Sequence, residues 1–141
     1  MPKILNFGGF IKDFRSSIKI KLDKIDLAML DSFENVVAEA KTKAPIDHKG
    51  NDIGSTISLT RTSNLKYNIK VGNKYAAYYE FGTGPHAKAY VPLLPDEWQK
   101  IAEQYITPIE GKLRTYDYLY PSYESELPKL IEKMVKIVEN A

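Results

Sequence analysis

The longest regular pattern in the chain lies between Leu22 and Lys43. Apolar residues recur there at steps of three and four positions: Leu22, Ile25, Met29, Phe33, Val36, Val37 and Ala40. This spacing gathers them on one face of an α-helix, with polar residues on the other side. The α conformation is disfavoured for Ala44 because Pro45 follows it. The pattern therefore predicts an amphipathic core helix over residues 22–43.

A different period follows between Ser55 and Gly72. Leu65, Tyr67, Ile69 and Val71 alternate with polar residues, and a shorter alternation around Ile57 and Leu59 precedes them. Strict alternation over such lengths is typical of half-buried β-strands. We expect a β-hairpin that turns at 62–64, with its lysine face in water.

The second half of the chain predicts two more helices. Pro95 suits the first turn of a helix that carries Trp98, Ile101, Ala102 and Tyr105, and Thr107-Pro108-Ile109-Glu110 reads as a capping box that starts a short second segment. A terminal amphipathic helix has one apolar face, made of Leu127, Leu130, Ile131, Met134, Val135 and Val138. Residues 84–89 are expected to form an exposed loop.

The stretch Tyr75-Ala76-Ala77-Tyr78-Tyr79-Glu80-Phe81-Gly82-Thr83-Gly84 is aromatic and contains two glycines near the middle of the chain. Its rings need a surface to pack against, and its glycines allow a sharp turn. One interpretation is a short edge strand or turn with Glu80 pointing outward. A single acidic residue between Tyr79 and Phe81 is unusual for a core strand, because a charge there must be paired or face solvent.

The composition limits the function classes. The chain has 141 residues with a formal charge of +2 and no cysteine, which predicts one soluble globular domain made in a reducing cytoplasm, without disulfides or thiolate metal sites. Lys12, Asp13 and Arg15 interrupt the apolar stretch that a signal peptide would need. Asp47, His48 and Asp52 could suggest a metal site, although loop acids more often cap turns. We expect no metal and no cofactor.

Residues 1–21 are basic, with five Lys or Arg against one Asp, and they also carry Phe7, Phe10 and Arg15. This arm either packs on the body as an amphipathic lead-in or orders on a partner subunit or an acidic surface, and contact with nucleic acid is a further alternative. A second candidate contact region lies around Pro121, where Tyr116, Tyr118, Tyr120 and Tyr123 form a predicted tyrosine-rich loop or short strand. Tyrosines of this kind serve an interface or the monomer's own packing.

Three stretches occur in a recognisable order: Ala44-Pro45-Ile46-Asp47 after a long helix, Tyr75-Ala76 with Glu80-Phe81-Gly82-Thr83, and Pro92-Leu93-Leu94-Pro95 before a helix. This order resembles the HK97 gp10-like family of tailed-phage neck and tail-completion proteins, over about residues 25–106. The resemblance implies an α+β fold in which a small antiparallel β-sheet packs against a long N-terminal helix and C-terminal helices. It divides the chain into an arm (1–21), a gp10-like core (22–110) and a C-terminal extension (111–141).

The resemblance also implies a structural virion protein, a homo-oligomeric ring at the head–tail junction that contacts other neck, connector and tail proteins. Residues expected at subunit contacts are Phe7, Phe10, Arg15, Tyr78, Glu80, Phe81, Tyr116, Tyr118 and Tyr120. The resemblance implies that Glu80 is a polar anchor, hydrogen-bonded to backbone or to a neighbour. The alternative is a nucleic-acid-binding accessory protein that uses the basic arm, including contact with packaged DNA. An enzyme is not expected, because the acids Glu80, Asp47 and Asp96 and the two histidines are accompanied by no nucleophile elbow, phosphate loop or metal-ligand spacing.

Overall fold

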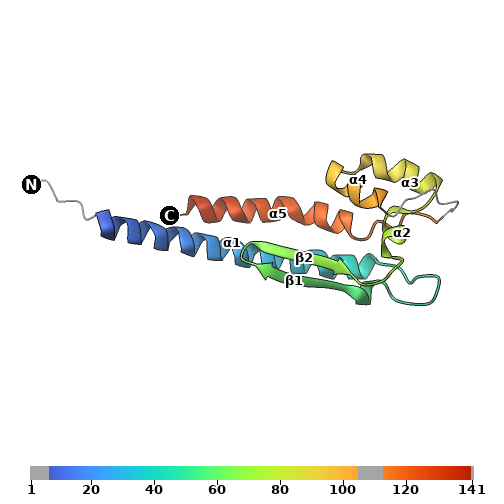
Figure 1. Cartoon of the computed structure of the whole chain (residues 1–141), viewed down its shortest axis with the longest axis horizontal. Helices are drawn as coiled ribbons and strands as arrows, with labels where there is room; N and C mark the ends of the chain where they lie inside the picture. The colour runs from blue at the N-terminus through green and yellow to red at the C-terminus, as the bar shows by residue number, and fades with distance from the viewer. Residues whose placement is uncertain (1–6, 105–112, 141) are drawn as a thin grey trace, which may run out of the picture.

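A computed structural model describes residues 7–104 and 113–140, without the side chains of residues 7–11 and 14. Helix α1 (Phe7–Lys43) and helix α5 (Tyr120–Glu139) form a long antiparallel pair, seen along its length in Figure 1. Lys133 Nζ lies 2.8 Å from Asp31 Oδ2, and Lys21 Nζ donates to the carbonyl of Val138 near the end of α5. Residues 7–20 of α1 therefore extend past the C-terminal end of its partner.

The predicted core helix is confirmed, although its start is wrong by fifteen residues. It begins at Phe7 rather than Leu22 and ends at Lys43, as Pro45 requires. No proline interrupts residues 7–43, and apolar residues continue at helical spacing from Leu22 back to Ile18. The described part of the predicted basic arm is thus continuous with the core helix.

The hairpin consists of β1 (Ile57–Ser63) and β2 (Lys66–Val71), paired antiparallel with Ile57 opposite Val71. Its inner face packs on α1, while the lysines of β2 are exposed, as the alternation predicts. Asp26 of α1 fixes the hairpin tip: its carboxylate accepts the N–H of Leu65, 2.9 Å away, and pairs with Arg61. The backbone hydrogen bond from Leu65, more than any other contact, lowers the pKa of Asp26.

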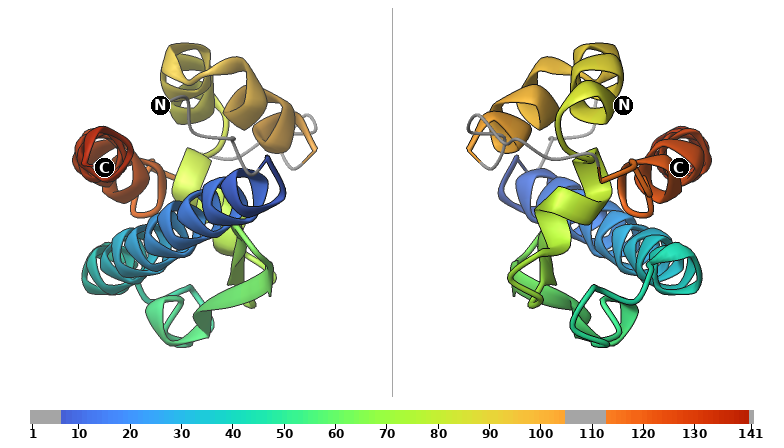
Figure 2. Two further views of the ribbon diagram at one scale, coloured as in Figure 1. Left: turned by 90° about the vertical axis from the view of Figure 1, so that its left-hand side faces the viewer. Right: turned by 90° about the vertical axis from the view of Figure 1, so that its right-hand side faces the viewer.

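Short helical elements follow the hairpin. They are α2 (Ala76–Phe81), α3 (Pro85–Tyr90), the 3₁₀ turn η2 (Val91–Leu93) and α4 (Asp96–Glu103), while a first 3₁₀ turn, η1 (Gly54–Thr56), precedes β1. The views along the molecule place α3 and α4 on the opposite side of α1 from the hairpin (Figure 2). The helix predicted after Pro95 is confirmed as α4. Its expected residue Tyr105 and the capping box at Thr107 lie outside the described residues.

Two local predictions are wrong. The central stretch is a helix, α2, and not an edge strand, because Ala76 and Ala77 favour helix while Gly82, in a positive-φ conformation, ends it. Residues 84–89 are largely helical in α3, whose first position is Pro85, a residue suited to that position.

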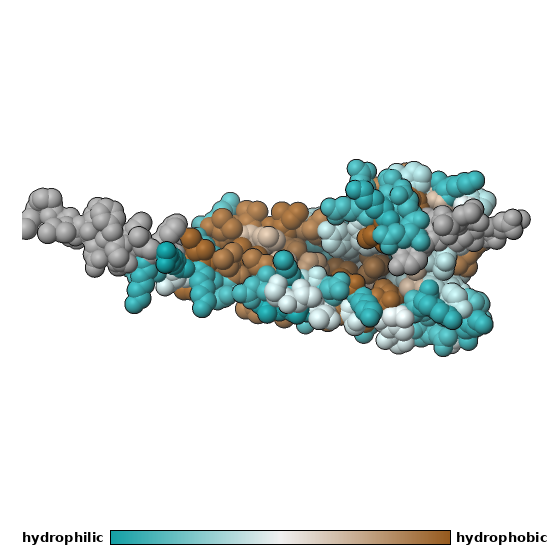
Figure 3. Space-filling view, viewed as in Figure 1, coloured by the Kyte–Doolittle hydropathy of each residue, from teal (hydrophilic) through white to brown (hydrophobic). Residues whose placement is uncertain are grey.

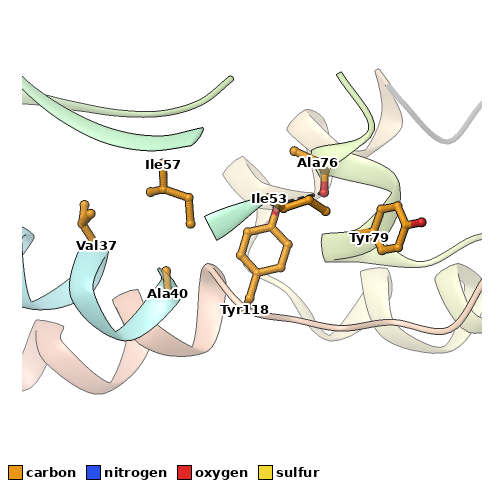
Figure 4. Close-up of a cluster of buried hydrophobic side chains, with 7 residues drawn as sticks. All are labelled: Val37, Ala40, Ile53, Ile57, Ala76, Tyr79 and Tyr118. Carbon is orange, nitrogen blue, oxygen red and sulfur yellow. Dashed lines mark hydrogen bonds between the residues drawn. The ribbon is translucent and has the colours of Figure 1, made fainter. Parts of the chain in front are cut away.

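The main core lies where α1, the hairpin, α2 and the segment before α5 meet. Its buried members are Val37, Ala40, Ile53, Ile57, Ala76, Tyr79 and Tyr118 (Figure 4). Tyr118 is 1% exposed, and its hydroxyl donates to the carbonyl of Ala76 at 2.9 Å. A second cluster, of Phe81, Leu94 and Ala102, joins α2 to α4. Residues on both sides of position 110 therefore share one interior.

Candidate subunit interface

Glu80 is held inside the molecule by the backbone of the C-terminal part. It is 3% exposed, and its two carboxylate oxygens accept the N–H groups of Leu119 and Tyr120 at 2.9 and 2.8 Å. The polar anchor that the resemblance implies for Glu80 is confirmed, with backbone N–H groups as its partners, and the outward-pointing alternative is wrong. Burial raises the pKa of Glu80, and the hydrogen bonds from Leu119 and Tyr120 oppose that rise.

Gly82 allows the same two segments to approach closely. Its φ is +79°, and a Cβ atom at this position would lie 2.6 Å from the hydroxyl oxygen of Thr115. The neighbouring backbone is cross-linked by hydrogen bonds from Thr83 N to Leu113 O and from Tyr116 N to Tyr79 O, both 2.9 Å. Glycine is required here because any side chain would separate residues 79–83 from residues 113–116.

Asp47 organises the loop after α1. Its Oδ1 accepts the N–H groups of Lys49 and Asn51, and its Oδ2 accepts the side-chain amide of Asn73 at 2.8 Å. The Asn73 hydrogen bond is the largest cause that lowers the pKa of Asp47 to about 2. Asn73 in turn accepts the N–H of Tyr75, so Asp47 connects the loop to the start of α2.

Tyr79 connects the loop after α1 to the C-terminal segment. Its hydroxyl accepts the N–H of His48 at 2.7 Å, while its ring packs against Tyr116 with centroids 5.6 Å apart. The sequence motifs at Asp47 and at Tyr79–Gly82 are therefore in contact with each other and with the C-terminal segment. Their described contacts are internal and hold the fold together.

The structure separates the predicted contact residues into four groups. Glu80, Phe81 and Tyr118 are buried within the chain, and this corrects their assignment to a subunit surface. The segment 113–120 folds back on α2, which places Tyr118 in the main core and encloses Glu80, while Phe81 packs with Leu94 and Ala102. Tyr78, Tyr116 and Tyr120 are half-buried, and Arg15 is exposed on α1. The side chains of Phe7 and Phe10 lie outside the described part.

The predicted tyrosine-rich loop is a loop in its first part only. Residues 113–118 have no regular secondary structure, as a loop would, but Tyr120 and Tyr123 belong to α5. The rings of these two tyrosines pack on Trp98 of α4, with centroids 4.9 and 5.9 Å away.

Exposed apolar side chains on the two long helices were missed. The residues exposed at 40–65% are Ile18, Ile20, Leu22 and Leu27 on α1, and Ile131, Val135 and Val138 on α5. Apolar residues gather over α5 and α1 on the face shown in Figure 3. The terminal-helix pattern placed Ile131, Val135 and Val138 on the same apolar face as Leu130, but α1 covers only the side of α5 that carries Leu130. Their i, i+4, i+7 spacing was the available signal.

A groove of about 640 Å³ lies between the hairpin and the C-terminal helices. One side is the stretch Asn68–Lys74, and the other includes Trp98 and Ile101 of α4 and Tyr123 of α5. We call it the β2-edge groove. Within the described ranges, no three acidic or histidine side chains are grouped so as to hold a metal ion. The helices in those ranges are also too short or too polar to cross a membrane.

The family comparison matches residues 10–82, about half of the chain, to the HK97-gp10-like family, described as "Bacteriophage HK97-gp10, putative tail-component". The chain belongs to this family. The match ends at Gly82, so it covers α1, the hairpin and α2. No curated protein and no solved structure matches the chain.

Proposed function

We propose that this HK97-gp10-like protein is a ring subunit of the neck or tail-completion complex of a tailed phage, where it joins the head to the tail. Family membership carries the proposal, since the family is described as a phage tail component. The exposed apolar side chains of α1 and α5 support it, because such surfaces on soluble chains mark contacts with other proteins.

A closed ring needs two different contact surfaces on each subunit. This chain offers surfaces of different character: the apolar positions of α5 and the part of α1 that extends past α5. The subunit would contact both its copies and the neck, connector or tail proteins above and below. We place the assembled protein in the virion, at the head–tail junction.

The role we propose is structural and not catalytic. Glu80 and Asp47, two of the three candidate acids, both have their carboxylate oxygens engaged by backbone or amide donors. Their geometry therefore supports anchoring of loops.

Image reconstruction of the intact virion tests the proposal directly. We expect a ring of this protein between portal and tail. A map that assigns every density at that junction to other proteins would refute it. In solution, light scattering across protein concentrations should show a rise in mass, alone or after addition of a neck partner.

Contact with DNA is the second candidate. Lys12, Arg15 and Lys19 are exposed at i, i+3 and i+7 on α1, which places them on one helix face. DNA retention measured between about 50 and 200 mM salt tests this function, because each phosphate contact contributes to a steep negative salt slope. Substitution of the three residues by Gln should remove the slope, and retention unchanged by the substitution would exclude this face.

A further inference from the structure

The outer edge of β2 has unpaired backbone groups. Gly72 N donates to Thr56 O at 3.0 Å, which fixes the alternation of the antiparallel ladder. Ser58 and Lys70 therefore form a hydrogen-bonded pair, whereas the N–H and C=O groups of Ile69 and Val71 point away from β1. Outside the hairpin, no described residue forms a hydrogen bond with them. Open strand edges of this kind can accept another strand.

The β2-edge groove lies along this edge. It is lined by every residue from Asn68 to Lys74, including side chains that point to both faces of the strand, and by no residue of β1. A cavity on a face of the hairpin would contact alternate residues of both strands. The lining therefore places the groove beside the backbone of β2, where an added strand would lie.

The opposite wall and the floor are mostly apolar; the lining also includes Glu80, whose carboxylate is held by Leu119 and Tyr120. Trp98, Ile101 and Tyr123 line the far side, and Val36 of α1 lies at the floor, on the side of the hairpin's inner face. An extended segment in the groove would pair its backbone with Ile69 and Val71. Every second side chain would meet this apolar lining.

The exposed face of β2 determines which charge is favoured on the outward side chains of an incoming strand. Lys66 and Lys70 are exposed on that face, and neither has a carboxylate within 4.0 Å among the described residues. Opposite charges on adjacent strands attract, whereas like charges destabilise the pair. An incoming strand is therefore favoured when its outward side chains are acidic.

We propose that the β2-edge groove binds an extended segment of another protein chain, with alternating apolar and acidic residues, which adds a strand to the hairpin at β2. The recognition uses backbone hydrogen bonds for affinity and the two side-chain faces for selectivity. The inference is independent of whether the protein forms a ring.

The test is a titration of the full-length protein with a blocked seven-residue peptide of alternating Val and Glu. Trp98 is the single tryptophan of the chain and lines the groove, so its fluorescence reports occupancy. We expect a saturable change in emission. The same peptide with N-methyl groups on one edge should bind about tenfold more weakly, because it loses donors to the C=O groups of Ile69 and Val71.

A charge exchange supplies the matched control. Replacement of Glu by Lys in the peptide should weaken binding to the native protein, and Lys66→Glu with Lys70→Glu should reverse that preference. Both lysines are exposed, so circular dichroism should be unchanged. Absence of a saturable change, or equal binding of the N-methylated peptide, would overturn the proposal; the latter would indicate docking through side chains alone. A virion map without a ring would leave these binding results unaffected.

Discussion

Two carboxylates with opposite pKa shifts anchor the central motifs. Asp47 lies in a loop rich in N–H and amide donors, which stabilise its charge and lower its pKa. Glu80 is enclosed by α2 and the segment before α5, and burial raises its pKa despite two donors. Both residues act by holding segments that are distant in sequence, so each can be tested by a substitution that keeps its shape.

Glu80→Gln should destabilise the protein by about 1–3 kcal/mol. The amide NH₂ would face one of the two N–H groups, and that donor would lose its acceptor inside the molecule. Chemical denaturation measures the change. Glu124→Gln, at an exposed position of α5, is the control and should have little effect. Equal stability of the two variants would contradict the anchoring role.

Asp47 should make stability depend on pH in the acid range. Its folded pKa of about 2 lies below the value near 3.9 of an unfolded aspartate. Its contribution is therefore fully present above pH 4 and is lost as pH falls toward 2. Asp47→Asn should be less stable at pH 7 and should flatten the fall between pH 4 and 2. Melting temperatures across this range are the measurement, and parallel curves for the two proteins would exclude the effect.

At the scale of the elements, the local patterns predicted the hairpin, the end of α1, α4 and the terminal helix. They failed where a distant segment decides the structure. Nothing near Glu80 in sequence shows that Leu119 and Tyr120 will donate to it. Likewise, the pattern of α5 could not show that α1 would leave Val135 uncovered. The motifs around Tyr79 and Glu80 indicated a region that is central to the fold. In the described structure its contacts are made within the chain.

Tyr118 provides a test of that internal role. Tyr118→Ser should destabilise the protein by about 3–5 kcal/mol, because it removes a buried ring from the main core. Tyr118→Phe keeps the ring and loses only the hydrogen bond to Ala76, at a cost of about 1 kcal/mol.

Thermal denaturation separates these two variants. A melting temperature for Tyr118→Ser close to that of the native protein would instead return Tyr118 to a surface role, the placement first expected for it.

At the scale of the whole molecule, the long helices carry the surface that the proposed assembly would use. Ile131→Glu with Val135→Glu should prevent or weaken self-association while changing the free energy of unfolding by less than about 0.5 kcal/mol per site, since both side chains are exposed. Light scattering and incorporation into particles are the readouts. Lys136→Gln, also exposed on α5, is the control. Unchanged assembly of the double variant would contradict a role of Ile131 and Val135 in the subunit contact.

The contacts of Glu80, Gly82 and Tyr118 have a practical consequence for anyone who dissects this protein. The family-matched stretch stops at Gly82, yet its interior is completed by side chains and amides supplied more than thirty positions later. A fragment that ends at the family boundary would lack the ring of Tyr118 in its core. It would also leave the carboxylate of Glu80 without the N–H groups of Leu119 and Tyr120. Expression trials should therefore retain the chain through α5, because the family-matched portion alone lacks the ring of Tyr118 and the backbone donors that complete its interior.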